Sequence, residues 1–143
     1  MDIKSQAKQV EQREDAGFTV HIRDELGEKL YQDDEQTKPV TITVVGTYSR
    51  TYRRTIEAQR DRNIKQRKFN LDGDELLQQA LELEAACIRD WDGFTDDGAP
   101  VPYTKANAVA LLRQYPWIRE QVNAAMNDHA AFFQQPSPSS VSA

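Results

Sequence analysis

Carboxylates crowd one short stretch of the sequence, between Asp90 and Tyr103, and carboxylate oxygens can hold a metal ion or move a proton. Its opening Asp-x-Asp-Gly run resembles the start of a calcium-binding loop. The comparison then fails, because Phe94 and Val101 stand where that loop needs an oxygen ligand and a closing glutamate. The stretch therefore predicts a turn in which glycines take positive φ and aspartates bond backbone amides. We expect no metal ion or other cofactor. The aspartates concerned are Asp90, Asp92, Asp96 and Asp97.

The nucleophiles and general bases of the chain are few. His21 falls on the polar side of an expected strand, and His129 falls on the apolar stripe of an expected helix, where a hydrogen-bonded, half-buried histidine is the ordinary case. Cys87 lies among apolar residues and is expected to act as a small core side chain. Neither a phosphate-binding glycine loop nor a nucleophile elbow is present. We therefore expect no catalytic residues and no enzymatic activity.

A basic run between residues 48 and 70 could follow a phosphate backbone, with Tyr48 and Tyr52 stacking on bases. Against this interpretation, the chain carries a net charge of −5 and Glu57 and Asp61 interrupt the run. Nucleic acid is thus not the expected partner. The expected alternatives are a solvated helix and an electrostatic contact with an acidic partner. The acidic segment at residues 71–97 could supply such a contact, within the fold or from another copy of the chain. The basic residues are Arg50, Arg53, Arg54, Arg60, Arg62, Lys65, Arg67 and Lys68.

Aromatic residues gather in the last third of the chain beside prolines. Core packing is the simplest explanation, but Tyr and Trp at a helix junction are also typical of protein interfaces. Together with the first residues of the basic run, they form the expected partner-binding set. Its members are Tyr48, Tyr52, Arg53, Arg54, Trp91, Tyr103, Tyr115, Trp117, Phe132 and Phe133.

Hydrophobic periodicity divides the chain into strands followed by helices. Alternation at residues 18–22 and the β-branched run 40–45, with Val40, Ile42 and Val44 on one face, predict two antiparallel strands. Helical spacing follows at residues 49–68, from Asp72 to Trp91 with Gly93 as its stop, from a cap at Thr104 to residue 114, and from Pro116 to residue 133. The predicted fold class is α+β, with a small N-terminal antiparallel sheet of two or three strands and about four helices after it.

The domain boundaries follow from composition. Residues 1–16 are polar and are expected to form a flexible or weakly helical arm. Residues 17–133 form one α+β domain, with its β part at 17–47 and its helical part at 48–133. Residues 134–143 are a Pro/Ser tail that we expect to be disordered. The single cysteine, the lack of a signal-peptide pattern and the lack of a membrane-length apolar run predict a cytoplasmic protein.

The order of several short motifs resembles the tail assembly chaperones of long-tailed bacteriophages. In that family a strand ends in Val-Gly before a basic helix, and a further helix then ends in Trp-x-Gly. A turn carries Gly-x-Pro-x-Pro followed by Phe or Tyr, a helix has Asn three or four residues further on, and a final helix begins near Tyr-Pro. The resemblance spans roughly residues 17–133. The residues that carry it are Val44-Val45-Gly46-Thr47-Tyr48-Ser49, Tyr52-Arg53, Trp91-Asp92-Gly93-Phe94, Gly98-Ala99-Pro100-Val101-Pro102-Tyr103, Asn107 and Tyr115-Pro116-Trp117-Ile118-Arg119-Glu120-Gln121-Val122.

This resemblance implies a non-enzymatic role in the cytoplasm of the host cell. Such chaperones keep the hydrophobic tape-measure protein soluble and help to recruit subunits of the major tail (tube) protein. Self-association along the long client would suit the opposite charges of adjacent segments. Two alternatives stay open: a structural tail or neck component retained in the virion, and a small nucleic-acid-binding regulator that uses the basic helix 48–68.

Overall fold

A three-stranded antiparallel sheet with the order β1-β2-β3 is the centre of the fold in the computed structural model, which describes residues 1–134. The alternating apolar residues of β1 (Phe18–His21) and β2 (Thr41–Val44) form the expected pair, in which Phe18 lies opposite Val44. Val40, Ile42 and Val44 are all buried, which confirms the predicted core face of this run. The α+β fold class is therefore confirmed.

The third strand, β3 (Ile88–Asp92), comes from a segment that we expected to continue a helix. The helix before it, α3 (Gly73–Ala86), ends at Cys87, and the chain then pairs antiparallel with β2. The predicted helix from Asp72 to Trp91 is thus wrong in its last turn, and Gly93 follows a strand instead of stopping a helix. Its φ is +104° and an added Cβ would lie 2.8 Å from Gln32 Cγ, so glycine is required there.

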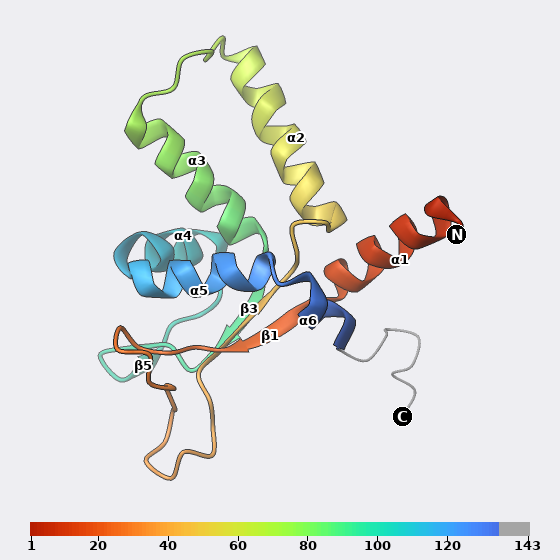
Figure 1. The fold of residues 1–143 in the computed structure, drawn as a ribbon. Coiled ribbons are helices and arrows are strands. Elements are labelled where there is room, and N and C mark those ends of the chain that lie inside the picture. The colour runs from red at the N-terminus through yellow and green to blue at the C-terminus, as the bar shows by residue number, and fades with distance from the viewer. Residues whose placement is uncertain (135–143) are drawn as a thin grey trace.

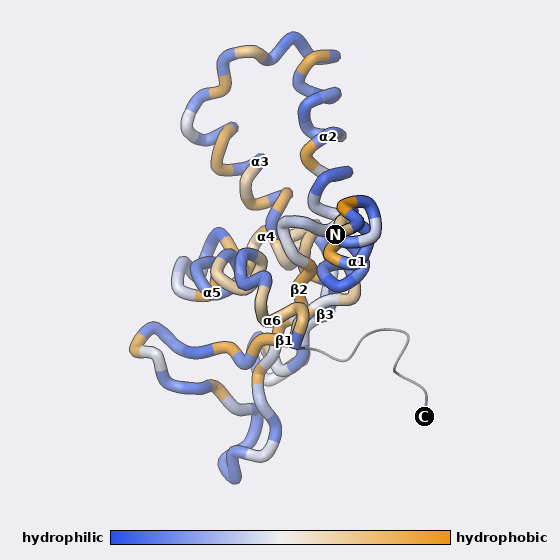
Figure 2. Tube along the Cα trace, turned by 45° about the vertical axis from the view of Figure 1, so that its right-hand side comes forward, coloured by the Kyte–Doolittle hydropathy of each residue, from blue (hydrophilic) through white to orange (hydrophobic). Residues whose placement is uncertain are grey.

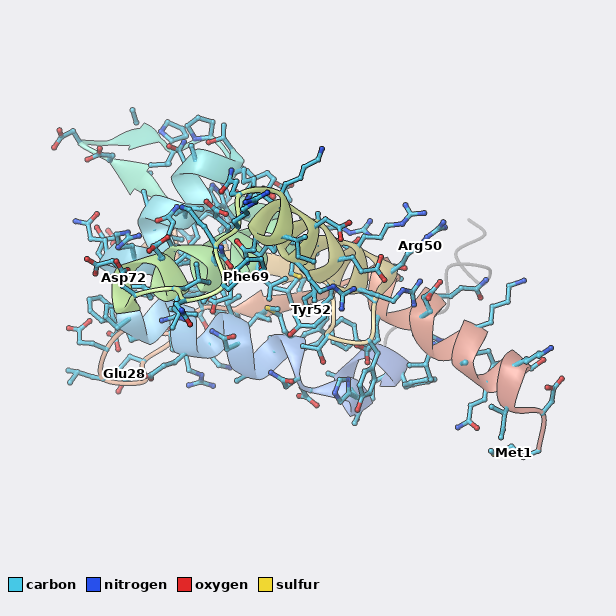
Figure 3. The ribbon with its side chains drawn as sticks, turned by 90° about the horizontal axis from the view of Figure 1, so that it is seen from above. Met1, Glu28, Arg50, Tyr52, Phe69 and Asp72 are labelled. Atoms are coloured by element: carbon cyan, nitrogen blue, oxygen red, sulfur yellow. The ribbon has the colours of Figure 1, made fainter. Side chains whose placement is uncertain are left out.

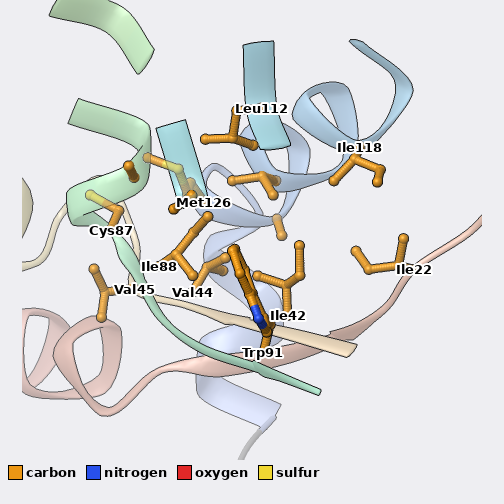
Figure 4. Close-up of a cluster of buried hydrophobic side chains, with 14 of the residues drawn as sticks. Ile22, Ile42, Val44, Val45, Cys87, Ile88, Trp91, Leu112, Ile118 and Met126 are labelled. Atoms are coloured by element: carbon orange, nitrogen blue, oxygen red, sulfur yellow. The ribbon is translucent and has the colours of Figure 1, made fainter. Parts of the chain in front are cut away.

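Two helices cover one face of the sheet and close the core (Figures 1 and 4). They are α4 (Lys105–Gln114), capped by Thr104 as expected, and α5 (Pro116–Met126), which has Pro116 in its first turn. Figure 4 shows strand side chains meeting helix side chains in this layer. The buried residues labelled there are Ile22, Ile42, Val44, Val45, Cys87, Ile88, Trp91, Leu112, Ile118 and Met126.

The connection between β2 and β3 is a long helical hairpin that rises from the rest of the molecule (Figure 1). Its first arm, α2 (Arg50–Lys65), begins at the N-cap Ser49, and its second arm α3 begins at the N-cap Asp72, as expected. The hydroxyl of Ser49 accepts from the amide of Tyr52 at 3.0 Å. The start of α2 lies near the sheet, while its far end stands away from it (Figure 1).

The two ends of the described chain are both helical. Of the two forms expected for residues 1–16, the structure has the helical one, because Ile3–Ala16 form the regular helix α1, capped by Asp2. The predicted last helix is also divided, since α5 ends at Met126 and a short α6 (His129–Gln134) follows. The described chain thus has six helices, and five of them follow β2 where about four were expected.

Other features complete the described chain. Residues 95–100 form a small hairpin of β4 (Thr95–Asp96) and β5 (Ala99–Pro100). Apart from Gln134, which ends α6, the Pro/Ser tail lies outside the described residues. Among the helices of residues 1–134, none is long and apolar enough to cross a bilayer.

Candidate partner-binding groove

Glu14, a fully buried carboxylate, fixes the point from which α1 and α2 diverge. One of its oxygens accepts from the amide of Tyr48 at 2.9 Å, and the other lies 2.6 Å from Nδ1 of His129. The backbone carbonyl of Glu14 accepts from the amide of Gly46 at 3.1 Å. We call Glu14, Gly46, Tyr48 and His129 the Glu14 cluster. It joins α1, the end of β2 and α6, three parts of the chain that are far apart in sequence.

The cluster explains the glycine after β2. A Cβ at position 46 would lie 1.9 Å from Oε1 of Glu14 and 3.0 Å from Cε2 of Phe132. Only glycine therefore lets the carboxylate approach the backbone this closely. His129 is half-buried and hydrogen-bonded, as predicted, and its ring stacks on Tyr48 with centroids 3.8 Å apart. Its carboxylate partner comes from 115 residues away, which sequence spacing could not reveal.

The apolar side of α2 is only partly covered in the described structure, since Tyr52 packs on the edge of the core and Tyr48 stacks on His129. None of the residues of α2 is buried, although its 16 residues form nearly four and a half turns. Tyr48, Tyr52 and Ile56 follow one another at intervals of four and so share a face. Tyr48 is 58% exposed and Ile56 is 37% exposed. This face is open to a partner.

The facing side of α1 also carries an apolar stripe, which the polar composition of the segment had hidden. Ile3, Ala7 and Val10 recur at intervals of four and three, and all three line the same depression as Tyr52 and Ile56. Ile3 is 70% exposed. Figure 3 shows α1 running outward to Met1, away from the start of α2. The two stripes therefore form the walls of an open V.

Between these walls lies a groove of about 850 Å³, which we call the α1–α2 groove. An ion pair joins the two walls, with Nη1 of Arg53 2.8 Å from Oε2 of Glu11. Figure 2 shows apolar positions on both helices amid polar ones. The residues that line the groove are Met1, Ile3, Gln6, Ala7, Val10, Glu11, Thr47, Tyr48, Ser49, Tyr52, Arg53, Ile56, Glu57 and Arg60.

The structure brings only part of the expected partner-binding set to this groove. Tyr48, Tyr52 and Arg53 line it, while Arg54 is exposed on α2 outside the lining. Sequence reasoning missed the whole α1 wall. The signal that could have revealed it is the weak apolar spacing from Ile3 to Val10.

The expected aromatic contacts from the last third of the chain belong mainly to the core. Phe132 is fully buried and Trp91 is 8% exposed, so neither ring offers a surface to a partner in this conformation. Trp91 packs edge-on against Tyr103 and donates from Nε1 to the carbonyl of Val101 at 2.8 Å. The remaining members are partly buried or exposed: Tyr103, Tyr115 and Trp117 pack on the core, and Phe133 is 44% exposed.

The hydroxyl of Tyr103 donates to the carbonyl of Ile88, which ties the turn after β5 to β3. Burial raises the pKa of Tyr103, and nearby Asp90 adds to this effect. Burial also raises the pKa of Cys87 to about 12, with Glu84 and Asp15 contributing. Cys87 is thus a protonated core side chain at neutral pH, as expected of it.

The basic run is partly neutralised inside the fold. Besides Arg53, two of its members form ion pairs with α3, at 3.1 Å between Arg62 and Glu82 and at 3.1 Å between Lys68 and Glu75. A contact between the basic run and the acidic segment 71–97 was expected either within the fold or between copies. These two ion pairs show that such a contact exists within the fold. These pairs reduce the positive charge that α2 could offer to a phosphate backbone.

The aspartate-rich stretch forms a turn. Asp97 and Gly98 have φ of +49° and +81° and connect β4 to β5, which is the pattern of a two-residue Asp-Gly hairpin. Asp90 accepts from the amide of Trp91 at 2.8 Å. Within residues 1–134, no group of three or more His, Cys, Asp or Glu side chains is placed to hold a metal ion.

Comparison with known proteins gives one result. A family model described as YdaY prophage protein matches residues 47–139, which include α2, all elements after it and the Tyr48–Ile56 wall of the groove. Neither the curated proteins nor the solved structures contain a match to the chain. Because the matched region covers well over half of the sequence, the chain belongs to the YdaY prophage protein family.

Proposed function

We propose that this prophage protein is a non-enzymatic tail assembly chaperone that binds the tape-measure protein in the host cytoplasm. It keeps this client soluble and helps to recruit major tail (tube) subunits to it. The observation that carries the proposal is α2, a 16-residue helix without a buried residue, whose apolar face lines an open groove. Soluble monomers rarely expose an apolar face of this kind, whereas a chaperone of long apolar helices needs such a face to bind its client.

Two further observations support the proposal. The chain belongs to a prophage family, so its partners are expected among phage proteins. The ordered motifs from Val44-Val45-Gly46 to Tyr115-Pro116-Trp117 resemble those of tail assembly chaperones. In the fold these motifs have structural roles, since Gly46 admits Glu14 and Pro116 starts α5.

Co-expression with the tape-measure protein of the same prophage tests the proposal. The chain is expected to co-purify with this client and to move it from the insoluble to the soluble fraction. Expression of the tape-measure protein alone gives the baseline. If neither the soluble yield nor co-purification exceeds that baseline, the chaperone function is wrong.

The main alternative is a structural tail or neck component that remains in the particle. Mass spectrometry of purified particles separates the two functions, because a chaperone is absent from them and a structural component is present in stoichiometric amount. The nucleic-acid alternative is weaker, since Arg53, Arg62 and Lys68 are engaged in ion pairs within the chain.

A further inference from the structure

We infer that the α1–α2 groove binds one amphipathic α-helix of the client, about three turns long, with its apolar side facing the groove. The identity of the client rests on the proposed function. The site and the form of the bound segment rest on the geometry of the groove itself. Neither the family match nor the resemblance assigns a binding surface to this chain, and the α1 wall lies outside the matched residues.

The walls of the groove exclude an extended strand as the occupant. Both walls are α-helices, whose backbone amides and carbonyls are bonded within the helix. They therefore present side chains and no free backbone edge with which a strand could pair. A segment that enters this apolar space must satisfy its own backbone groups, and a helix does so.

The length and the open side of the groove fit one helix that lies along it. Its α2 wall extends from Tyr48 to Arg60, which is about 18 Å at 1.5 Å per residue, or about three helical turns. The groove of about 850 Å³ is open along one side. A helix bound there buries one side and leaves the other in water, as an amphipathic helix does.

Charges on the outer part of the α2 wall determine which charged residues a bound helix should carry along its edge. Arg53 is already paired with Glu11. Glu57 and Arg60 line the groove further out, both are exposed, and neither has an ion-pair partner among the described residues. A client helix with a basic residue opposite Glu57 and an acidic residue one turn away, opposite Arg60, complements this rim.

A second copy of the chain fits the groove less well than a client helix. Fourteen residues line the groove, whereas a stable protein–protein interface uses about 20–30 residues on each side. A single helix needs no larger surface than the groove offers. An exchange of α1 between copies would also break the bonds that Glu14 makes to the amide of Tyr48 and to Nδ1 of His129 in its own chain.

A matched pair of substitutions on α2 tests the site. Ile56 lines the groove and Ile64 lies two turns further along the same helix, outside the lining and 56% exposed. Ile56→Glu is expected to lower the amount of tape-measure protein retained by the chain at least about tenfold, because it removes a buried apolar contact and places a charge there. Ile64→Glu is expected to leave retention unchanged. Both positions are exposed in the free chain, so both variants should fold, as circular dichroism would verify.

A second pair tests the other wall. Ile3→Glu changes the α1 stripe, and Leu26→Glu changes an 82% exposed leucine in the 22–40 connection, far from the groove lining. Only Ile3→Glu should reduce retention. Equal retention by wild type and both groove variants would overturn the inference while leaving the chaperone function intact. Failure of the wild-type chain to retain the client would instead refute the proposed function and its client together.

The form of the occupant can be read by cross-linking. A photoreactive phenylalanine in place of Tyr52 is expected to label client residues spaced three and four apart, the period of one helix face. Labels at alternate residues would indicate an extended segment and would overturn the inference. So would a chain dimer, seen by light scattering, that Ile56→Glu dissolves while client retention persists.

Discussion

At the scale of single residues, the sequence predicted the roles of some members of the Glu14 cluster and not of others. Gly46 stood out as the end of a strand, and His129 was expected to be hydrogen-bonded and half-buried. Glu14 did not stand out, because it lies in a polar segment without sustained apolar periodicity. A buried acid leaves no periodic signal of its own, and its partners come from residues 34 and 115 positions away.

Gly46→Ala is expected to destabilise the protein by about 3 kcal/mol. The added methyl would overlap the Glu14 carboxylate and press on Phe132, so the hydrogen bonds of the cluster must shift in a fully packed site. Urea unfolding followed by circular dichroism measures the change. Gly73→Ala is the matched control, because a methyl group added there would meet nothing within 4 Å and the residue is in the first turn of α3. A loss below about 1 kcal/mol for Gly46→Ala would contradict the close packing.

The raised pKa of Cys87 predicts how stability depends on alkaline pH. The thiol ionises near pH 9.0 when exposed and at about 12 in the fold, so above pH 9 the unfolded chain loses a proton that the folded chain keeps. The contribution of the buried thiol to the free energy of unfolding is fully present below pH 9. It declines by up to about 1.4 kcal/mol per pH unit as the pH rises toward 12. Urea unfolding at pH 8, 9.5 and 10.5 measures the slope. Cys87→Ala should have a smaller slope, with Tyr103 supplying part of the remainder; an identical slope would contradict this account.

At the scale of elements, β3 explains why one helix was predicted too long. Ile88 and Trp91 are three apart, a helical interval, and both are buried. In a regular strand they would face opposite sides, but the pairing shifts there: Thr43 lies opposite Asp90 and Val44 opposite Ile88, so Arg89 is an extra residue. This β-bulge turns both side chains into the core. A bulged strand and a helix can both place buried residues three positions apart. This spacing alone therefore does not distinguish the two structures.

The seam between α2 and α3 is polar, which makes α2 a separable element. Asn63 and Gln79 exchange side-chain hydrogen bonds at 3.1 and 2.7 Å, and Gln59 donates to the carbonyl of Gln79 at 2.7 Å. No buried apolar residue of α2 supports these bonds. Elements held in this way open locally at low free-energy cost. The groove wall is therefore expected to be the part of the fold that a bound helix stabilises most.

Asn63→Ala is expected to speed amide exchange in α2 about fivefold to tenfold and to leave β2 unchanged. The substitution removes the reciprocal pair with Gln79, and a net hydrogen-bond contribution of about 1 kcal/mol corresponds to this factor. Hydrogen exchange followed by mass spectrometry resolves the two elements. Gln66→Ala, an exposed amide at the end of the same helix, is the control. Equal acceleration in α2 and β2 would show that the hairpin opens only with the whole domain.

At the scale of the molecule, the fold class, the β1–β2 pair and the helix caps could be predicted from local patterns. Strand alternation, Ser, Thr or Asp before a helix, and proline in a first turn are all short-range signals. The groove could not, because it arises where α1 meets α2 and neither helix alone shows it. The N-terminal 46 residues lie before the family match, yet they supply one groove wall and the buried strand residues Ile42 and Val44.

Two N-terminal truncations separate the roles of α1 in binding and in stability. Deletion of residues 1–9 removes Met1, Ile3 and Ala7 from the groove wall but keeps Glu14, so we expect a loss of stability below about 1 kcal/mol and at least about tenfold less tape-measure protein retained. Deletion of residues 1–16 also removes the buried carboxylate and leaves the amides of Gly46 and Tyr48 unpaired, which should cost about 3–5 kcal/mol. Urea unfolding and client retention measure both effects. If the longer deletion unfolds like the intact chain, α1 is the dispensable arm that its polar composition indicates; if the shorter one retains the client fully, the groove needs only its α2 wall.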